Sequence, residues 1–130
     1  MSSIVLDASA LLALLRSEVG SDIVTAALPY AVISSVNYAE VLEKTLERGG
    51  QTDAVAHFIR ALAISIIPFD EDQAAAVADL HAQTKQEKLS FAALTCLTLA
   101  SLRRATLITA DQAMGRLKLP LKVTVIRHGL

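Results

Sequence analysis

The chain has 130 residues and a formal net charge of −1, and 53% of its residues are hydrophobic against 19% charged. This length suits one domain that buries its own core, and a single cysteine excludes a disulfide framework. No apolar run reaches the roughly 18 residues of a membrane span, and the first residues lack the pattern of a signal peptide, so we expect one domain over residues 1–130 in the cytoplasm.

The first predicted element is a short buried strand over Ile4-Val5-Leu6, and Asp7 follows at its carboxyl end. A helix-forming run, 10–15, comes directly behind it. Ligand crevices of open α/β sheets lie outside the carboxyl ends of the strands, so Asp7 is placed where a site is usual. Asp7 and Ser9 are also favoured N-cap residues, and taken alone a helix cap explains them equally well.

The next elements alternate between helices and strands. We expect a helix from Ser21 to about Leu28, a short strand over 31–34, and a helix over 36–48 capped by Ser35. The apolar stripe of that last helix is predicted to be Val36, Ala39, Leu42 and Leu46, which leaves Asn37 and Glu40 off it. A further helix then extends to about Ala63, before a strand over 64–67 that ends at Pro68.

The second half continues the alternation. Acids at 70–72 belong in the first turn of a helix that extends to about Thr84, where the helix dipole favours them. Ser90 is the expected cap of a mostly apolar, buried helix over 91–103, in which Cys96 is an inert thiol. Strands are predicted over 105–109 and 121–126. Five strands alternating with helices predict an α/β fold whose mostly parallel sheet is covered on both faces.

Charge is distributed unevenly along the chain. From Lys85 onward, eight basic residues and two acidic ones give +6, so residues 1–84 carry the remaining −7. Such asymmetry is compatible with a polyanionic partner held by the basic part, although solvated helix faces also explain it. The bias therefore favours nucleic acid only mildly.

Three acids from distant parts of the chain are predicted to share one crevice. Asp111 stands just past a strand, as Asp7 does, and Glu40 lies one turn into the helix after the second strand. Clustered carboxylates repel one another, so such a group is usually neutralised by a hard cation with oxygen ligands, here Mg²⁺ or Mn²⁺. An ion of this kind can activate water for in-line hydrolysis of a phosphate ester.

At this point the chain resembles a PIN-domain ribonuclease, in particular a VapC-type toxin of a bacterial toxin–antitoxin pair. The matching stretches come in family order and at family spacing, and they are 5–9, 34–41, 89–91, 96–100 and 107–111. The resemblance implies a three-layer α/β/α fold with a central five-stranded sheet. It also implies a divalent metal held by clustered acids and cleavage of RNA phosphodiesters.

The resemblance further implies roles for single residues and for partners. Asp7, Glu40 and Asp111 would hold the metal and its water, while Ser9 and Thr109 would assist through their hydroxyls. A cognate VapB-like antitoxin would cover the site, and the toxin would form a homodimer and a hetero-oligomer with it, away from any membrane.

One position departs from the family pattern. Family members usually carry an aspartate early in the helix after the Leu-Ser pair, where this chain has Ala93. Three explanations are open: an introduced inactivating change, a natural member without activity, or a site in which Glu87 or water substitutes. We favour the first because the other three acids are intact. We expect weak metal binding and impaired RNA cleavage, the alternative being a catalytically dead module that only binds an antitoxin.

Two other enzyme and signalling classes fit less well. A haloacid-dehalogenase-like phosphohydrolase would use Asp7 as its nucleophile, but it needs a second acid two residues later, where this chain has Ser9. A receiver-like module needs a phosphorylatable aspartate after the third strand, and Asp70, which follows Pro68-Phe69, matches that poorly.

Overall fold

The structure is a computed structural model that describes residues 3–127. Five strands form one sheet in the order β3-β2-β1-β4-β5, and every neighbouring pair is parallel. The strands are β1 (Ile4–Leu6), β2 (Ala31–Ser34), β3 (Ser65–Ile67), β4 (Thr106–Thr109) and β5 (Val123–Val125). The predicted α/β fold is thus confirmed, with a sheet that is wholly rather than mostly parallel.

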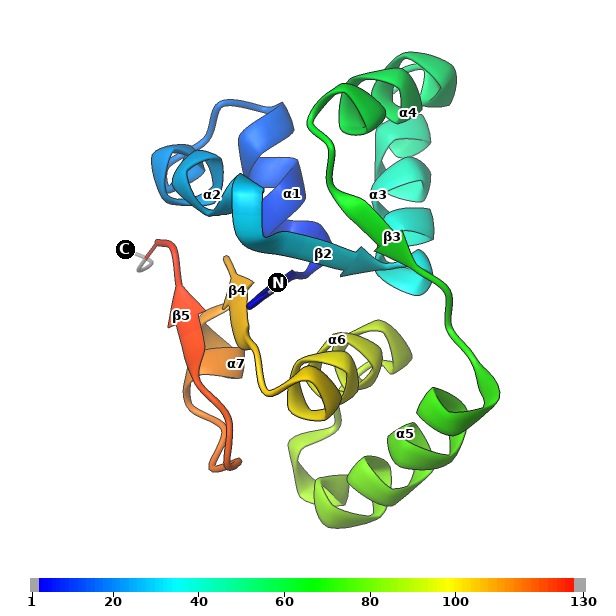
Figure 1. Ribbon diagram of the computed structural model, residues 1–130, viewed down its shortest axis with the longest axis vertical. Coiled ribbons are helices and arrows are strands. Elements are labelled where there is room, and N and C mark those ends of the chain that lie inside the picture. The colour runs from blue at the N-terminus through cyan, green and yellow to red at the C-terminus, as the bar shows by residue number, and fades with distance from the viewer. Residues whose placement is uncertain (1–2, 128–130) are drawn as a thin grey trace.

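Helices cover both faces of this sheet, which gives three layers (Figure 1). In the view of Figure 1, α1 to α4 lie above β2, and α5 and α6 lie below it. The helices are α1 (Ala8–Leu15), α2 (Ser21–Ala27), α3 (Ser35–Glu47), α4 (Thr52–Ala61), α5 (Glu71–Gln83), α6 (Phe91–Arg103) and α7 (Gln112–Gly115).

The alternation of side chains along the strands explains the two separate cores. Val5, Val32 and Leu107 pack with α6 on one face. Their neighbours Leu6, Ile33 and Ile108 pack with α1 to α4 on the other. Successive residues of a strand point to opposite faces, so short apolar strands can serve two layers at once. This arrangement leaves the carboxyl edge of the central strands for polar residues.

Several local details were not predicted. Two 3₁₀ turns, Leu28–Tyr30 and Lys85–Glu87, and the short helix α7 lie where the sequence indicated only connections. The cap of α3 is Ser34 rather than Ser35, because the Ser34 hydroxyl accepts from the amide of Val36. The Ser35 hydroxyl instead accepts from the amide of Phe69 and so binds the segment that follows β3.

The predicted apolar stripe of α3 is wrong. Ala39 is exposed and Leu46 is 61% exposed, whereas the buried positions of the helix are Asn37, Val41 and Thr45. Hydrogen bonds make this orientation possible, since Thr45 donates to the carbonyl of Val41 and Asn37 donates across to α6. Buried polar groups are tolerated when they are bonded in this way, and the helix is rotated accordingly.

The structure also bears on the membrane question. Within residues 3–127, no helix is both long enough and apolar enough to cross a bilayer.

Candidate functional site

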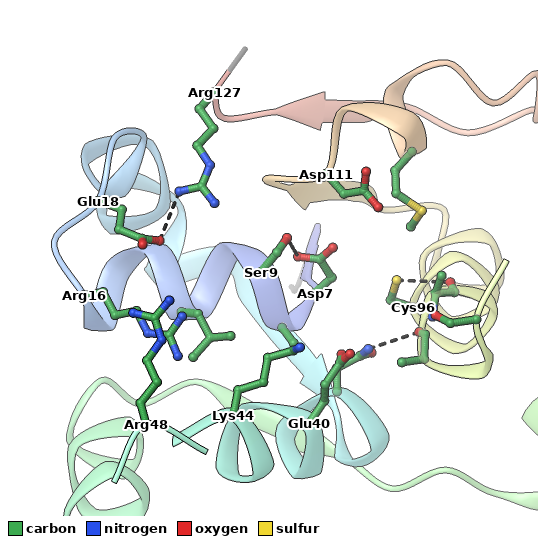
Figure 2. Close-up of a pocket in the computed structure, with 17 residues that line it drawn as sticks. Asp7, Ser9, Arg16, Glu18, Glu40, Lys44, Arg48, Cys96, Asp111 and Arg127 are labelled. Carbon is green, nitrogen blue, oxygen red and sulfur yellow. Dashed lines mark hydrogen bonds and ion pairs between the residues drawn. The ribbon is translucent and has the colours of Figure 1, made fainter. Parts of the chain in front are cut away.

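The carboxyl edge of the sheet opens into a cavity of about 320 Å³ that contains all three predicted acids (Figure 2). Asp7 follows β1 directly, and Asp111 follows β4 by two residues. Glu40 comes from the second turn of α3, which begins where β2 ends. Because β1 pairs with both β2 and β4, these three chain segments meet at one edge.

Asp7 is the most constrained of the three. Its side chain is held at 8% exposure, and its Oδ1 accepts hydrogen bonds from the Ala10 amide at 2.9 Å and the Ser9 hydroxyl at 2.7 Å. The Thr109 hydroxyl donates to Oδ2. Asp7 is therefore the N-cap of α1 and a site residue at once, so the two alternatives left open by the sequence are compatible. Three donors on one carboxylate fix its orientation.

Ser9 and Thr109 connect Asp7 to the segment after β4. The Ser9 hydroxyl accepts from the amide of Ala110 at 2.8 Å, and the Thr109 hydroxyl accepts from the amide of Asp111 at 3.0 Å. Each hydroxyl has one proton to donate, and both Ser9 and Thr109 donate theirs to Asp7. The 3.2 Å separation between the two hydroxyl oxygens is therefore a contact and not a further hydrogen bond. The hydroxyls thus position Asp7 relative to Asp111.

The negative charge in the cavity is incompletely compensated. Burial raises the pKa of Asp7 above its usual value, more than its hydrogen bonds lower it, and the nearby charge of Asp111 raises it further. Burial also raises the pKa of Glu40, against the opposing effects of Lys44 and Asn37. Two carboxyls with raised pKa values at one edge indicate a place where a cation would be stabilised.

Asn37 is a site residue that the sequence pattern missed. It is 1% exposed, and its Nδ2 donates to the carbonyl of Ala92 at 3.1 Å, which ties α3 to the first turn of α6. A hydrogen bond from Asn37 also lowers the pKa of Glu40. Its Oδ1 is buried without a hydrogen-bond partner in the described part of the chain. Only the polarity of the residue, placed three positions before Glu40, could have signalled this role.

The wall contributed by α6 is apolar where the family pattern expects an acid. Ala93 lines the cavity together with Ala92 and Cys96 of α6, and Met114 of α7 lies in the same lining. Burial raises the pKa of the Cys96 thiol well above its ordinary value, and the nearby charges of Asp7 and Glu40 add to this. Its Sγ donates to the carbonyl of Ala93 at 3.2 Å, so Cys96 is a buried thiol, as expected.

Cations also line the cavity. Lys44 extends toward Glu40, whereas Arg16 and Arg48 lie at the end away from Asp111, where Figure 2 shows their side chains directed to the same region. Arg127 also reaches the cavity, where its Nη1 lies 3.0 Å from a carboxylate oxygen of Glu18. Sequence reasoning missed Arg16, Lys44 and Arg48 because they stand at the C-terminal ends of α1 and α3, where the helix dipole alone favours positive charge.

The donors suit a hydrated hard cation rather than an ion enclosed by protein. Among residues 3–127, no group of three or more His, Cys, Asp or Glu side chains lies close enough together to hold a metal ion between them. Mg²⁺ is usually bound by one or two carboxylates, with water and substrate phosphates completing its shell. Carboxylate oxygens and the uncompensated charge around Asp7 fit that mode. The three-acid ligand set stays a prediction.

Glu87 does not replace the missing acid within the cavity. It lines a separate cavity with Leu89, Arg116 and others, whereas Ala93 faces the cavity of Asp7. Of the three explanations for Ala93, substitution by Glu87 is therefore the one that the arrangement disfavours.

Comparison with known proteins identifies the relatives of this chain. The sequence model of the PIN domain matches residues 4–119. No curated protein sequence matches the chain significantly.

Solved structures share its fold over almost the whole chain. A toxin–antitoxin complex from Klebsiella pneumoniae superposes with a TM-score of 0.77 at 21% identity, covering 96% of this chain and 98% of that one. DNA-bound VapBC from Salmonella typhimurium gives 0.77 at 12% identity, covering 98% and 100%. VapBC-5 from Mycobacterium tuberculosis gives 0.59 at 22% identity, covering 97% and 99%. At these identities the likeness shows the fold.

Proposed function

This chain belongs to the PIN-domain family, and from that membership we propose that it is a VapC-type toxin, a divalent-metal-dependent endoribonuclease whose activity is impaired by Ala93. Proteins of this family are generally nucleases. The observation that carries the proposal is Asp7, held by three donors in a cavity that also contains Glu40 and Asp111.

The residues divide the proposed work between them. Asp7, with Glu40 and Asp111, would hold Mg²⁺ or Mn²⁺, which when bound polarises the phosphate and lowers the pKa of water. Ser9 and Thr109 keep both oxygens of Asp7 oriented into the cavity. Glu40, whose pKa is raised, is suited to accept a proton from the attacking water at its carboxylate.

Partners follow from the structural neighbours. The neighbour from Klebsiella pneumoniae is a toxin–antitoxin complex and that from Salmonella typhimurium is VapBC bound to DNA. We propose that this chain likewise binds a VapB-like antitoxin that covers the cavity, and that it forms a homodimer within a toxin–antitoxin hetero-oligomer. Because an RNA substrate and an antitoxin of this kind are found in the cytoplasm, we propose the cytoplasm as its location.

The apolar wall around Ala93 supports a second candidate, a catalytically dead PIN module that only binds an antitoxin. RNA cleavage by this chain and by Ala93→Asp, each in Mg²⁺, Mn²⁺ and EDTA, separates the two. Cleavage by Ala93→Asp that EDTA abolishes supports the ribonuclease. Failure of both proteins to cut a panel of structured and single-stranded RNAs refutes it and leaves the binding module.

A further inference from the structure

Most of the basic residues in the acid-rich part of the chain line the cavity that contains the acids. Residues 1–84 carry a net charge of −7 and contain four basic residues: Arg16, Lys44, Arg48 and Arg60. Three of the four, all except Arg60, line the cavity that contains the acids. Of the basic residues between Lys85 and the last described residue, Arg127, only Arg127 itself lines the cavity, and it is paired with Glu18.

Two of these cations follow Glu40 at helical spacing. Lys44 stands four residues after Glu40 on α3, and Arg48, the C-cap of that helix, stands four residues further, so the three positions lie on one face about 6 Å apart along the axis. The Lys44 side chain extends toward Glu40 and the Arg48 side chain toward Arg16, so the cations lead from the acids to the far end of the cavity (Figure 2). Arg16, at the end of α1, faces the same end of the cavity as Arg48 (Figure 2).

Neither arginine is neutralised by the protein. Within residues 3–127 the one ion pair is that of Arg127 with Glu18, so Arg16 and Arg48 have no carboxylate partner there. The helix dipole explains positive charge at the ends of α1 and α3, but it does not require the two guanidinium groups to approach each other in one cavity. Two guanidinium groups that line one cavity without a carboxylate partner leave positive charge available to an anion.

We infer that Arg16, Lys44 and Arg48 form a cation ladder that binds successive phosphates of a single RNA strand, on the side of the cleavage position away from Asp111. The inference rests on the proposed function, because it places the substrate of that same site. RNA is favoured over an acidic peptide because the cations begin one helical turn from Glu40, so one strand can contact them and reach the acids. Arginine suits such contacts through its planar, multiple donors.

The test measures binding without cleavage. A 5′-fluorescein-labelled single-stranded RNA 12-mer of mixed sequence is titrated with the full chain in EDTA, by fluorescence anisotropy, at several KCl concentrations. Each lost phosphate contact lowers the slope of log K against log salt by about 0.7, which is about fivefold in affinity at 0.1 M salt. Arg16→Gln/Arg48→Gln should therefore bind about 25-fold more weakly, with a slope reduced by about 1.4.

Two matched variants complete the design. Arg60→Gln/Arg103→Gln removes the same charge from exposed positions outside the cavity and should leave the slope nearly unchanged. Arg16→Lys/Arg48→Lys keeps the charge and should keep most of the slope. Urea unfolding of each variant checks that a loss of RNA binding does not come from misfolding.

Three results would overturn the ladder: no RNA binding by the parent chain, no effect of Arg16→Gln/Arg48→Gln on RNA binding, or an equal loss of RNA binding in the Arg60→Gln/Arg103→Gln control. A fluorescein-labelled poly-glutamate peptide is titrated in the same way. If Arg16→Gln/Arg48→Gln binds RNA unchanged but binds this peptide more weakly, the cations belong to a site for an acidic protein segment instead. Cleavage by Ala93→Asp in Mg²⁺ is measured separately. If Ala93→Asp does not cleave RNA while Arg16→Gln/Arg48→Gln still weakens RNA binding, the catalytic proposal is refuted and phosphate binding by the cations stands.

Discussion

An aspartate at position 93, the third residue of α6, would add a carboxylate to the three predicted acids of the cavity, Asp7, Glu40 and Asp111. The Ala93 amide already donates to the Ser90 cap at 3.1 Å, so the backbone there is well placed for an acidic side chain. The helix dipole would stabilise the new charge by about 0.3–1 kcal/mol. Repulsion from Asp7 and Glu40, whose pKa values are already raised, opposes this. In EDTA we therefore expect the free energy of unfolding to change by less than about 1 kcal/mol.

Metal reverses that balance. An added group at a metal site changes affinity on the order of 10- to 100-fold, equivalent to about 1.4–2.7 kcal/mol. When the Mn²⁺ concentration is well above the dissociation constants of both the parent chain and Ala93→Asp, this difference in affinity appears in full as extra stability of the metal-bound variant. Urea unfolding with and without saturating MnCl₂ should thus show a larger Mn²⁺ stabilisation for Ala93→Asp than for the parent chain.

Ala93→Asn is the matched control, because it adds the same shape without the charge. It should gain little Mn²⁺ stabilisation and no EDTA-sensitive RNA cleavage. Equal Mn²⁺ stabilisation in the parent, Ala93→Asn and Ala93→Asp would refute the argument that the cavity holds a metal and lacks this acid.

Three further substitutions test the site. Asp7→Asn keeps the cap of α1 but removes a buried charge, so in EDTA at pH 7 it should stabilise the fold on the order of 1 kcal/mol while abolishing Mn²⁺ stabilisation. The pKa of Asp7 is raised from 3.8 on folding, so ionising Asp7 lowers the stability of the folded protein; this cost is absent below pH 3.8 and grows as pH rises through the folded pKa. In urea unfolding from pH 4 to 7, the stability advantage of Asp7→Asn over the parent chain should therefore increase. A constant difference would contradict this. Asn37→Ala removes the hydrogen bond to Ala92 and should lower the free energy of unfolding by about 1–3 kcal/mol. Because the Asn37 side chain also lowers the pKa of Glu40, the pKa of Glu40 measured by NMR should rise in this variant. An unchanged pKa would show that the Asn37 amide does not contact Glu40. Thr109→Val removes one donor to Asp7 and should weaken Mn²⁺ binding about 10-fold by calorimetry, whereas a wild-type affinity would show that Ser9 and the Ala10 amide suffice.

Local sequence was sufficient for much of the fold. The apolar strand of residues 4–6 followed by Asp7, the caps Asp70 and Ser90, and the buried helix α6 all match the expected positions within a few residues. These features depend on neighbours in the chain, namely hydrophobic periodicity and side chains that bond to nearby amides. The convergence of Asp7, Glu40 and Asp111 on one edge followed from a general rule of parallel sheets, and the shared cavity agrees with it.

Other features depended on contacts between distant segments. Which column of α3 is buried was decided by the bond from Asn37 to α6, 55 residues away, since the helical period fits more than one apolar stripe. The roles of Ser9 and Thr109 required β1 and β4 to be neighbours, because their hydroxyls bond across that pair.

Thus the sequence by itself determined the elements, the parallel sheet and the acids at its carboxyl edge, because these follow from local periodicity and from the geometry of α/β crossovers. Only the tertiary structure decided which cations share the cavity. Charge along the sequence pointed to the segment after Lys85 as the source of cations, yet Arg16 and Arg48 from the acidic segment line the cavity. Electrostatic fields depend on separation in space, and the packing of α1 beside α3, rather than position along the chain, brings those charges together.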